Sequence, residues 1–447
     1  MTSGAVTRVA VVAALAAACG DSIRKTEPGP LDTFFYPTGL GILGDKIVVA
    51  SSNADLTYSS DTGGSLIVAN VCEPWPACAD SISGATNLPS FSGQVGVADP
   101  ARCAALGTAG PFVIVPIRGS DLVYRFTADA SGALACDGCE AGVGSRDHGD
   151  PFAVGIACGP GLARAFVGFL RSSGNAWITQ LDLQKNPGEE GYVRIRQIEG
   201  GGQVRAFAYD ERIKRLYFTR TATSAETQLR WVDLASGCLF DVSPGADPQG
   251  CSDGFSKLDE LPDGLELRGI ALANERATIQ RAYLTARIYD AAAAALAGGR
   301  VGDFDGLLLV VDLWEDLTGT LRIDMVDQIP IGYGAGDVRV LPARTGKRDV
   351  VVALASDDGV LWIYDDDTGG RVAIGRDPAT GAPIVGHDTG LAVRPEAPGG
   401  IARVYVGSFR ENHVTPIDVP LDAPETAAPV TSNGVIRRIG PRIGGAP

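Results

Sequence analysis

The segment TGLAVRPEAPGGIARVYVGSFRENHVTPIDVP, residues 389–420, decides the fold of this 447-residue chain. It contains short apolar runs that are separated by Gly, Pro and charged residues. Runs of about four to seven apolar residues bounded in this way are typical of strands that are buried on both faces. Similar groups of runs recur seven times along the chain, with a period of roughly 50 to 70 residues. The sequence therefore predicts a repeated, all-β architecture.

The repeats can be aligned run by run. First strands are expected at TGLGIL (38–43), QVGVA (94–98), FAVGIA (152–157), QVRAFAYD (203–210), ELRGIALA (266–273), DVRVLP (337–342) and TGLAVRP (389–395). Second strands are expected at KIVVASS (46–52), FVIVPIR (112–118), AFVGFLR (165–171), RLYFTR (215–220), RAYLTAR (281–287), DVVVALAS (349–356) and RVYVGSFR (403–410). A third strand follows in each repeat, and five of them carry an Asp near the end: Asp182, Asp233, Asp312, Asp365 and Asp418.

Fourth strands complete the repeats, most clearly at VRIRQIEG (193–200), LRIDMVDQIPIG (321–332), RVAIG (371–375) and GVIRRIG (434–440). Small residues gather in the first strands, as expected for strands that crowd around an axis. This pattern predicts a single seven-bladed β-propeller with four antiparallel strands per blade over residues 32–440. An eighth blade within residues 72–93 is the alternative. Ring closure also stays open, because either residues 434–440 or residues 32–36 (DTFFY) could complete the last blade.

Two motifs carry a resemblance to a known family. RVYVGS (403–408) and RLYFT (215–219), each followed by a loop and a strand that ends in Asp, resemble the YVTN-type propeller repeats, which are similar to the seven-bladed lactonase-like propellers. The resemblance covers about residues 34–440. It implies the propeller fold more strongly than a function, because the family includes binding and surface proteins as well as lactonases.

The N-terminus predicts export. Arg8 is followed by ten apolar residues (9–18). This run is too short to span a bilayer, because a spanning helix needs about 20 residues. Its length and the preceding charge fit a signal peptide. LAAACG (15–20) resembles the lipobox of bacterial lipoproteins, although Ala16 stands where Leu is preferred. The resemblance implies cleavage before Cys19 and a lipid on its thiol; an ordinary signal peptide ending in AAA (16–18) is the alternative. We expect a signal peptide at 1–18, a lipidated Cys19 and tether at 19–31, and a tail at 441–447.

The remaining cysteines support this address. Eight follow Cys19, and an even number in an exported chain suggests disulfides. Cys72 with Cys78 and Cys238 with Cys251 would close short loops, Cys136 and Cys139 form a C-x-x-C pair, and Cys103 and Cys158 occupy equivalent places in neighbouring repeats. The spacing does not fix the connectivity, but the last two could pair across the repeats.

Charge and motifs exclude several function classes. A formal net charge of −15 argues against nucleic acid as a partner. The three histidines, His148, His387 and His413, have no metal-ligand spacing, and the chain has no GxSxG, P-loop or dinucleotide-binding motif. The sequence thus predicts no catalytic constellation, no metal site and no cofactor.

Five arginines are candidate ligand-binding residues, because each ends the second strand of a repeat: Arg118, Arg171, Arg220, Arg287 and Arg410. In a ring they would form a partial circle on one face, suited to carboxylate or phosphate ligands. The alternative is that each pairs with a neighbouring acid and holds blades together. Arg205, Arg268, Arg339 and Arg394 recur on first strands and could either line the channel or bridge blades.

These observations predict a monomeric, lipid-anchored protein, held by Cys19 at the outer membrane on its periplasmic or surface side. Its propeller would be a scaffold that binds an envelope protein or a small anionic ligand through its loop face. A lactonase-like hydrolase that uses Arg and His at the channel mouth is one alternative. A structural docking component of the envelope is another.

Overall fold

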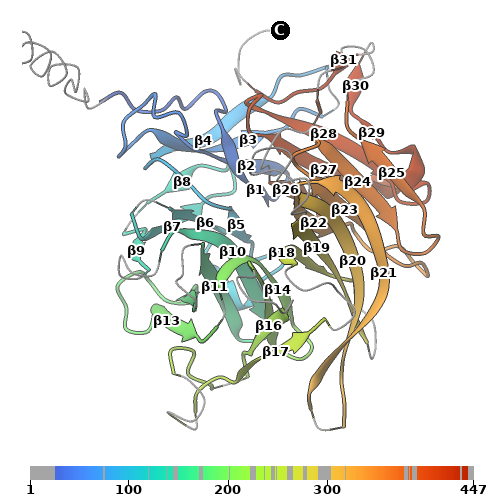
Figure 1. The fold of residues 1–447 in the computed structure, drawn as a ribbon. Coiled ribbons are helices and arrows are strands. Elements are labelled where there is room, and N and C mark those ends of the chain that lie inside the picture. The colour runs from blue at the N-terminus through green and yellow to red at the C-terminus, as the bar shows by residue number, and fades with distance from the viewer. Residues whose placement is uncertain are drawn as a thin grey trace, which may run out of the picture.

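Seven four-stranded antiparallel sheets form a ring in which the first strand of each sheet lies nearest the centre (Figure 1). This computed structural model describes residues 26–73, 76–118, 120–136, 138–143, 149–170, 175–200, 202–221, 228–235, 237–242, 247, 249–258, 265–274, 279–289, 304–317, 319–376, 381, 383–384, 390–432 and 435–440. The predicted seven-bladed β-propeller is thereby confirmed. Residues 81–88 are the fourth strand of the first blade, so the segment 72–93 contributes to that blade and not to an eighth.

Each blade is built from consecutive strands. In chain order the seven blades are β1 (Pro37–Leu43), β2 (Lys46–Ser51), β3 (Gly64–Asn70) and β4 (Ser81–Leu88); β5 (Gly96–Ala98), β6 (Phe112–Ile117), β7 (Leu122–Ala128) and β8 (Leu134–Ala135), with β9 (Glu140–Gly142) also on β7; β10 (Pro151–Gly159), β11 (Leu162–Phe169), β12 (Ala176–Asp182) and β13 (Val193–Ile198); β14 (Gln203–Asp210), β15 (Arg215–Thr221), β16 (Gln228–Asp233) and β17 (Asp253–Lys257); β18 (Glu266–Leu272), β19 (Gln280–Tyr289), β20 (Phe304–Glu315) and β21 (Leu321–Tyr333); β22 (Ala335–Val340), β23 (Val350–Ala355), β24 (Val360–Asp365) and β25 (Arg371–Ile374); β26 (Leu391–Val393), β27 (Ile401–Ser408), β28 (His413–Pro420) and β29 (Ala428–Pro429).

The strand register is the same in every blade. Each of the five aspartates near the third-strand ends lies directly opposite a residue near the start of the second strand in its own blade. In four blades that partner is an arginine: Arg164↔Asp182, Arg215↔Asp233, Arg281↔Asp312 and Arg403↔Asp418. Four of the five aspartates form an ion pair with an arginine of their own blade: Arg215–Asp233, Arg281–Asp312, Arg344–Asp365 and Arg403–Asp418. Arg164 instead donates to Gln180 at 3.2 Å.

The core lies between neighbouring blades. The inner strands of a blade are buried between its neighbours, and small residues on the strand nearest the axis leave room for side chains of the next blade. A Cβ at Gly41 would lie 2.7 Å from Val97 Cγ2, and one at Gly155 would lie 2.4 Å from Phe207 Cβ. These glycines are required by the close approach of the next blade.

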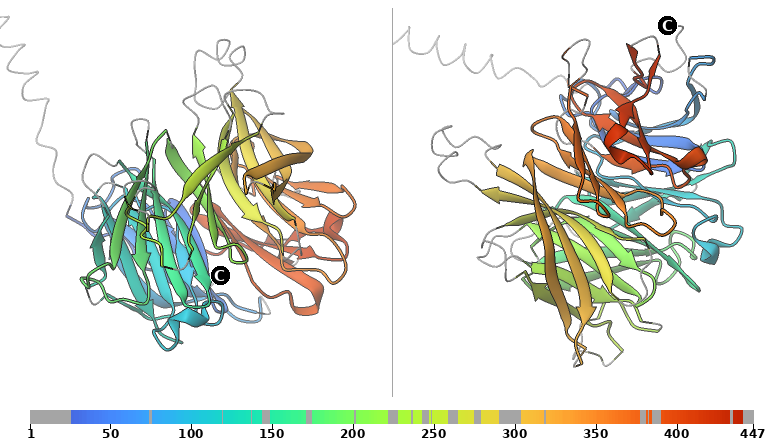
Figure 2. Two further views of the ribbon diagram at one scale, coloured as in Figure 1. Left: turned by 90° about the horizontal axis from the view of Figure 1, so that it is seen from below. Right: turned by 90° about the vertical axis from the view of Figure 1, so that its right-hand side faces the viewer.

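The first and last blades close the ring without exchanging a strand. Their strands β1 and β26 lie side by side, and the blue and red blades meet in Figures 1 and 2. The fourth strand of the last blade begins earlier than expected, at β29. After it, β30 (Thr431–Ser432) pairs with β31 (Val435–Ile436) in a separate two-stranded sheet. Of the segment 434–440, Ile439 pairs with Val414 of β28. Of the segment 32–36, Phe34 is buried beside Ile439, and the Tyr36 N–H donates to Asn412 Oδ1 at 2.7 Å.

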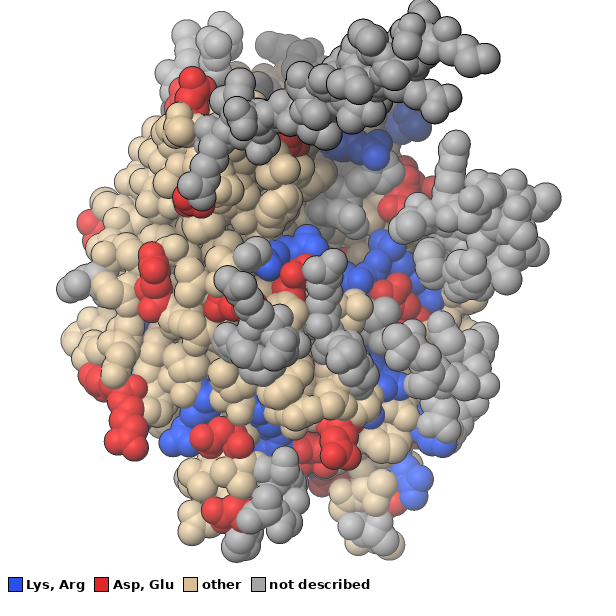
Figure 3. Space-filling model, turned by 60° about the vertical axis from the view of Figure 1, so that its left-hand side comes forward, with Lys and Arg blue, Asp and Glu red and all other residues tan. Residues whose placement is uncertain are grey.

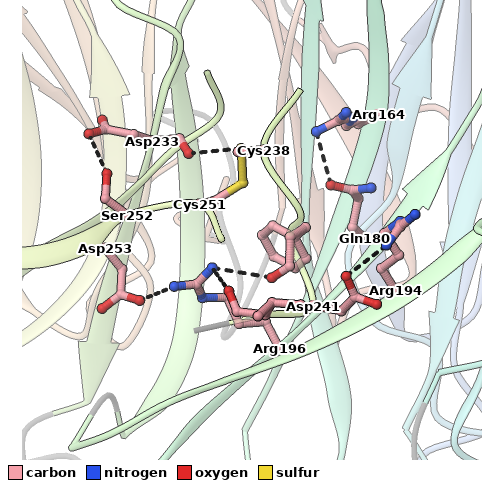
Figure 4. Close-up of a disulfide and its surroundings, with 12 residues drawn as sticks. Arg164, Gln180, Arg194, Arg196, Asp233, Cys238, Asp241, Cys251, Ser252 and Asp253 are labelled. Carbon is pink, nitrogen blue, oxygen red and sulfur yellow. Dashed lines mark hydrogen bonds and ion pairs between the residues drawn. A yellow bond between two sulfur atoms is a disulfide. The ribbon is translucent and has the colours of Figure 1, made fainter. Parts of the chain in front are cut away.

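Four disulfides join the eight cysteines and settle the connectivity that the sequence left open: Cys72–Cys78, Cys103–Cys158, Cys136–Cys139 and Cys238–Cys251. Cys103–Cys158 links the second blade to the third. Cys238–Cys251 folds the loop after β16 against the third blade, where Arg196 of β13 donates to the carbonyl of Phe240 at 3.2 Å and pairs with Asp253 (Figure 4).

Two features lie outside the ring. The hairpin of β20 and β21 extends well beyond the other blades (Figures 1 and 2). Residues at the end of the expected tether contact the first blade, because the Gly29 N–H donates to the Thr62 carbonyl at 2.9 Å. Within the described part of the chain, no helix has the length and apolar character that crossing a bilayer demands.

Candidate functional site: the central channel

The predicted circle of arginines lies at the end of the channel where second strands end. Arg220 and Arg287 are both 6% exposed and bond to backbone between blades. Arg220 donates to the carbonyl of Gly200 in the link from the previous blade. Arg287 Nε donates to the carbonyl of Ala335, the first residue of the next blade, at 2.9 Å.

The other members of the circle differ in exposure. Arg118 is partly exposed, lies 3.6 Å from Asp150 of the next blade and stacks over Phe152 with its guanidinium carbon 5.7 Å from the ring centre. Arg410 is exposed. Arg171, His148, His387 and Cys19 lie outside the described residues. Arg118, Arg220 and Arg287 thus all contact neighbouring blades, and the ligand role of the five arginines remains a prediction.

A cavity of about 430 Å³ lies at the opposite end of the channel, where first strands end. First strands of blades one, two, six and seven form most of its wall. The apolar part of the wall comes from Leu40, Ile42, Val95, Val97, Val340, Leu341, Pro342, Leu391, Val393 and Pro395. Its polar side chains are Arg102, Asn274, Arg339 and Arg394, and none of its lining residues is acidic.

The three arginines of the cavity keep unused donors. Both hydrogen bonds of the Arg339 side chain within the described chain come from Nη1, to Asp337 Oδ1 at 2.5 Å and to the Val338 carbonyl at 3.0 Å. Arg394 uses Nη1 for Glu73, at 3.0 Å from Oε2. Arg102 follows β5 in an exposed turn. Each guanidinium has five N–H donors, so all three can bind an anion in the cavity.

Two carboxylates, Glu266 and Asp337, form ion pairs with first-strand arginines but do not line the cavity. Glu266 lies between Arg205 at 3.6 Å and Arg268 at 3.2 Å. Asp337, with its side chain 9% exposed, pairs with Arg339 and accepts the Leu391 N–H at 3.4 Å. Burial raises the pKa of Asp337, and Arg339 opposes that rise.

Asn274 connects the cavity to a second one. Its amide donates to the Leu341 carbonyl at 2.9 Å and to Asp349 Oδ1 at 2.8 Å. The adjoining cavity, of about 460 Å³, is also lined by Arg344, Lys347, Arg348 and Asp367. The bonds to Leu341 and Asp349 fix Asn274 between the two spaces.

In the described residues no three His, Cys, Asp or Glu side chains gather as a metal site. His413 is buried, and that burial lowers its pKa to about 4. It begins β28 at the end of the channel where second strands end, away from the cavity. On the face shown in Figure 3, basic and acidic side chains are interspersed.

Comparison with known proteins gives distant structural matches. No family model and no curated protein matches the chain. Among solved structures, a Bacteroides fragilis protein described as "a putative 6-phosphogluconolactonase" has a TM-score of 0.46 and 13% identity over 76% of this chain and 83% of its own. A Bacteroides uniformis protein with the same description has a TM-score of 0.44 and 14% identity, covering 88% of both chains. A chain of the Mitotic Checkpoint Complex has a TM-score of 0.47 and 13% identity over 87% and 91%.

Sequence reasoning noticed Arg339 and Arg394 but missed Arg102 and Asn274 as parts of one cavity. Arg102 lies in a turn of the second blade and Asn274 at the end of a first strand in the fifth. Cys103, which follows Arg102, was recognised as a repeat position. That neighbour was the available signal for placing Arg102 near the axis.

Proposed function

We propose that this chain is an exported binding protein, tethered by a lipid on Cys19, that takes a small organic anion into the central channel. One observation carries the proposal: the cavity wall holds three arginines and no carboxylate in a chain of net charge −15. Apolar side chains with a few directed polar groups are typical of ligand sites. The paired cysteines support the exported address, because disulfides persist in oxidising compartments.

Thermal unfolding of a soluble form that begins at Gly20 tests the binding role. Small carboxylates, phosphate esters, lactones and neutral amides are compared on the wild type and on Val393→Trp, which fills the cavity from a half-buried position. A ligand at about 100 times its Kd stabilises by about 2.7 kcal/mol. We expect a stabilising compound that Val393→Trp no longer binds, while Leu317→Trp on the exposed β20–β21 hairpin still does. Stabilisation that survives Val393→Trp would place binding elsewhere, for example at the circle of five arginines.

The anchor is tested separately in a bacterial host. We expect palmitate to label the wild type and not Cys19→Ser, with the labelled protein in the outer membrane. A wild type that palmitate does not label would favour an ordinary signal peptide. The hydrolase alternative is tested on the soluble form that begins at Gly20. Hydrolysis of the lactones by that protein would favour it.

A further inference from the structure

Seven equivalent first-strand positions, one per blade, can be compared because every blade shares one register. In the fifth blade, for example, Asp312 of the third strand pairs with Arg281 of the second strand. Two residues later, Tyr283 of the second strand pairs with Ala271 of the first strand, and the position of Ala271 is the one compared here in all seven blades. Six of them hold glycine or alanine, and the sixth blade alone holds a long side chain: Gly41, Gly96, Gly155, Ala208, Ala271, Ala392 and Arg339.

The small residues have a packing reason that does not hold for Arg339. At Gly96 a Cβ would lie 2.3 Å from Val154 Cγ1 of the next blade, so that blade fills the space. Between blades six and seven, Arg339 and Leu391 instead line the cavity. The Arg339 side chain is 37% exposed, and the fork of Nε and Nη2 makes no hydrogen bond within the described chain.

We propose that Arg339 is the specificity-determining residue of the channel and that its ligand is a small monocarboxylate with an apolar body. This rests on the proposed function and names the ligand class of that site. A planar guanidinium fork binds the two oxygens of a carboxylate side by side. The aliphatic wall of Leu40, Ile42 and Val95 suits an apolar chain or ring.

The fifth blade offers a matched control. Glu266 and Arg268 repeat the spacing of Asp337 and Arg339 on the first strand, and they form the same kind of ion pair, at 3.2 Å. Neither lines the cavity. The variant Asp337→Asn/Arg339→Ala removes the pair without leaving a buried charge, and alanine is the residue of three other blades at that position. Glu266→Gln/Arg268→Ala removes the control pair.

Titration calorimetry of the soluble protein with sodium octanoate and sodium phenylacetate tests the proposal, with octanamide, phenylacetamide and inorganic phosphate as comparisons. We expect at least one of the carboxylates to bind and its amide to bind at least about tenfold more weakly. Asp337→Asn/Arg339→Ala should lose about tenfold or more, and the fifth-blade variant should stay within about twofold. Arg339→Lys, which keeps the charge without the fork, should bind at an intermediate level.

Three results would overturn the proposal: equal affinity for acid and amide, unchanged affinity of the Arg339 variant, or no binding of either carboxylate. If amides or phosphate bind in a manner that Val393→Trp abolishes, the channel remains a ligand site and the carboxylate assignment alone fails. If nothing binds in the channel, the proposed function fails as well.

Discussion

Two contacts between blades are built alike: the one between blades five and six, and the seam between blades seven and one. In each, an arginine binds an aspartate of its own blade and an acidic residue of the next blade, but the side chains differ in solvent exposure. Inside the ring, Arg281 bonds to Asp312 of its own blade at 2.8 Å and to Asp366 of the next at 2.8 Å. At the seam, Arg403 bonds to Asp418 at 2.6 Å and to Glu73 of the first blade. The Arg281 and Asp366 side chains are 5% and 2% exposed, whereas those of Arg403 and Glu73 are 17% and 36% exposed.

This difference teaches where electrostatics stabilises the ring. A buried pair is costly to break because its partner is left charged and desolvated. A hydrated pair contributes little because water replaces it. The seam also holds the buried Phe34, the Tyr36–Asn412 hydrogen bond, and a second ion pair, Arg437 with Asp80, whose side chains are only 1% and 15% exposed.

The largest expected effect follows from removing Arg281. Arg281→Met leaves Asp312 and Asp366 without their cation, next to the Tyr283 hydroxyl that donates to Asp366 at 3.1 Å. We expect a loss of roughly 4 kcal/mol of unfolding free energy, and about 1 kcal/mol for Arg403→Met at the seam. Urea unfolding of the two variants measures the difference. Equal losses would contradict the role of burial.

The Cys103–Cys158 disulfide is a covalent bond across an interior interface that the seam lacks. Cys103→Ser/Cys158→Ser opens a loop with a sequence separation of 55, so chain entropy predicts a loss of about 4 kcal/mol. Cys72→Ser/Cys78→Ser, with a separation of 6, should cost about 2 kcal/mol. Urea midpoints under non-reducing conditions check this order. The reverse order would show that the Cys72–Cys78 disulfide, beside the seam, stabilises the fold more than Cys103–Cys158 does.

Much of this fold was available in the sequence because a repeat exposes its own pattern. Strand order and the favoured count of seven blades follow from aligning the runs, and the alignment brings Cys103 and Cys158 to equivalent places. The aspartates at third-strand ends were noticed as well, but the acid from the next blade was not. Glu73 and Asp366 follow third strands in loops, and only the ring geometry brings them to Arg403 and Arg281.

The candidate site was less accessible for the same reason. A strand pattern gives the end of the channel to which a residue belongs, but not where neighbouring blades leave space. The arginines after second strands attracted attention because they recur in five repeats. Arg339 matters because its position does not recur, and this exception is visible only once the register of all blades is known.

A third prediction concerns acid at the seam. His413 is 3% exposed, and burial lowers its pKa from 6.5 to about 4. The folded protein therefore resists protonation, so this contribution to stability is complete above pH 6.5 and is lost as the pH falls towards 4. Its size by pH 4 is about 3 kcal/mol.

Its neighbours place that cost at the closure of the ring. Asn412 accepts the Tyr36 N–H, and Val414 donates its N–H to the Ile439 carbonyl at 3.0 Å. Urea midpoints of the wild type and His413→Gln at pH 7 and pH 4.5 test this. We expect the wild type to lose stability on acidification and the variant to lose clearly less. Parallel losses would assign the acid sensitivity to other groups.

The smallest effect on stability is expected for Glu73→Gln, and it sharpens the comparison most. Because Glu73 is partly exposed, its loss should cost below about 1 kcal/mol, and raised salt should narrow the gap to the wild type. Asp366→Asn, the interior counterpart, should cost more and respond less to salt. Glu73 also holds Arg394, which lines the cavity. Removing its charge should therefore raise octanoate affinity a few-fold while the ring stays closed, whereas a large loss of stability with no gain in affinity would show that the pair only holds the seam.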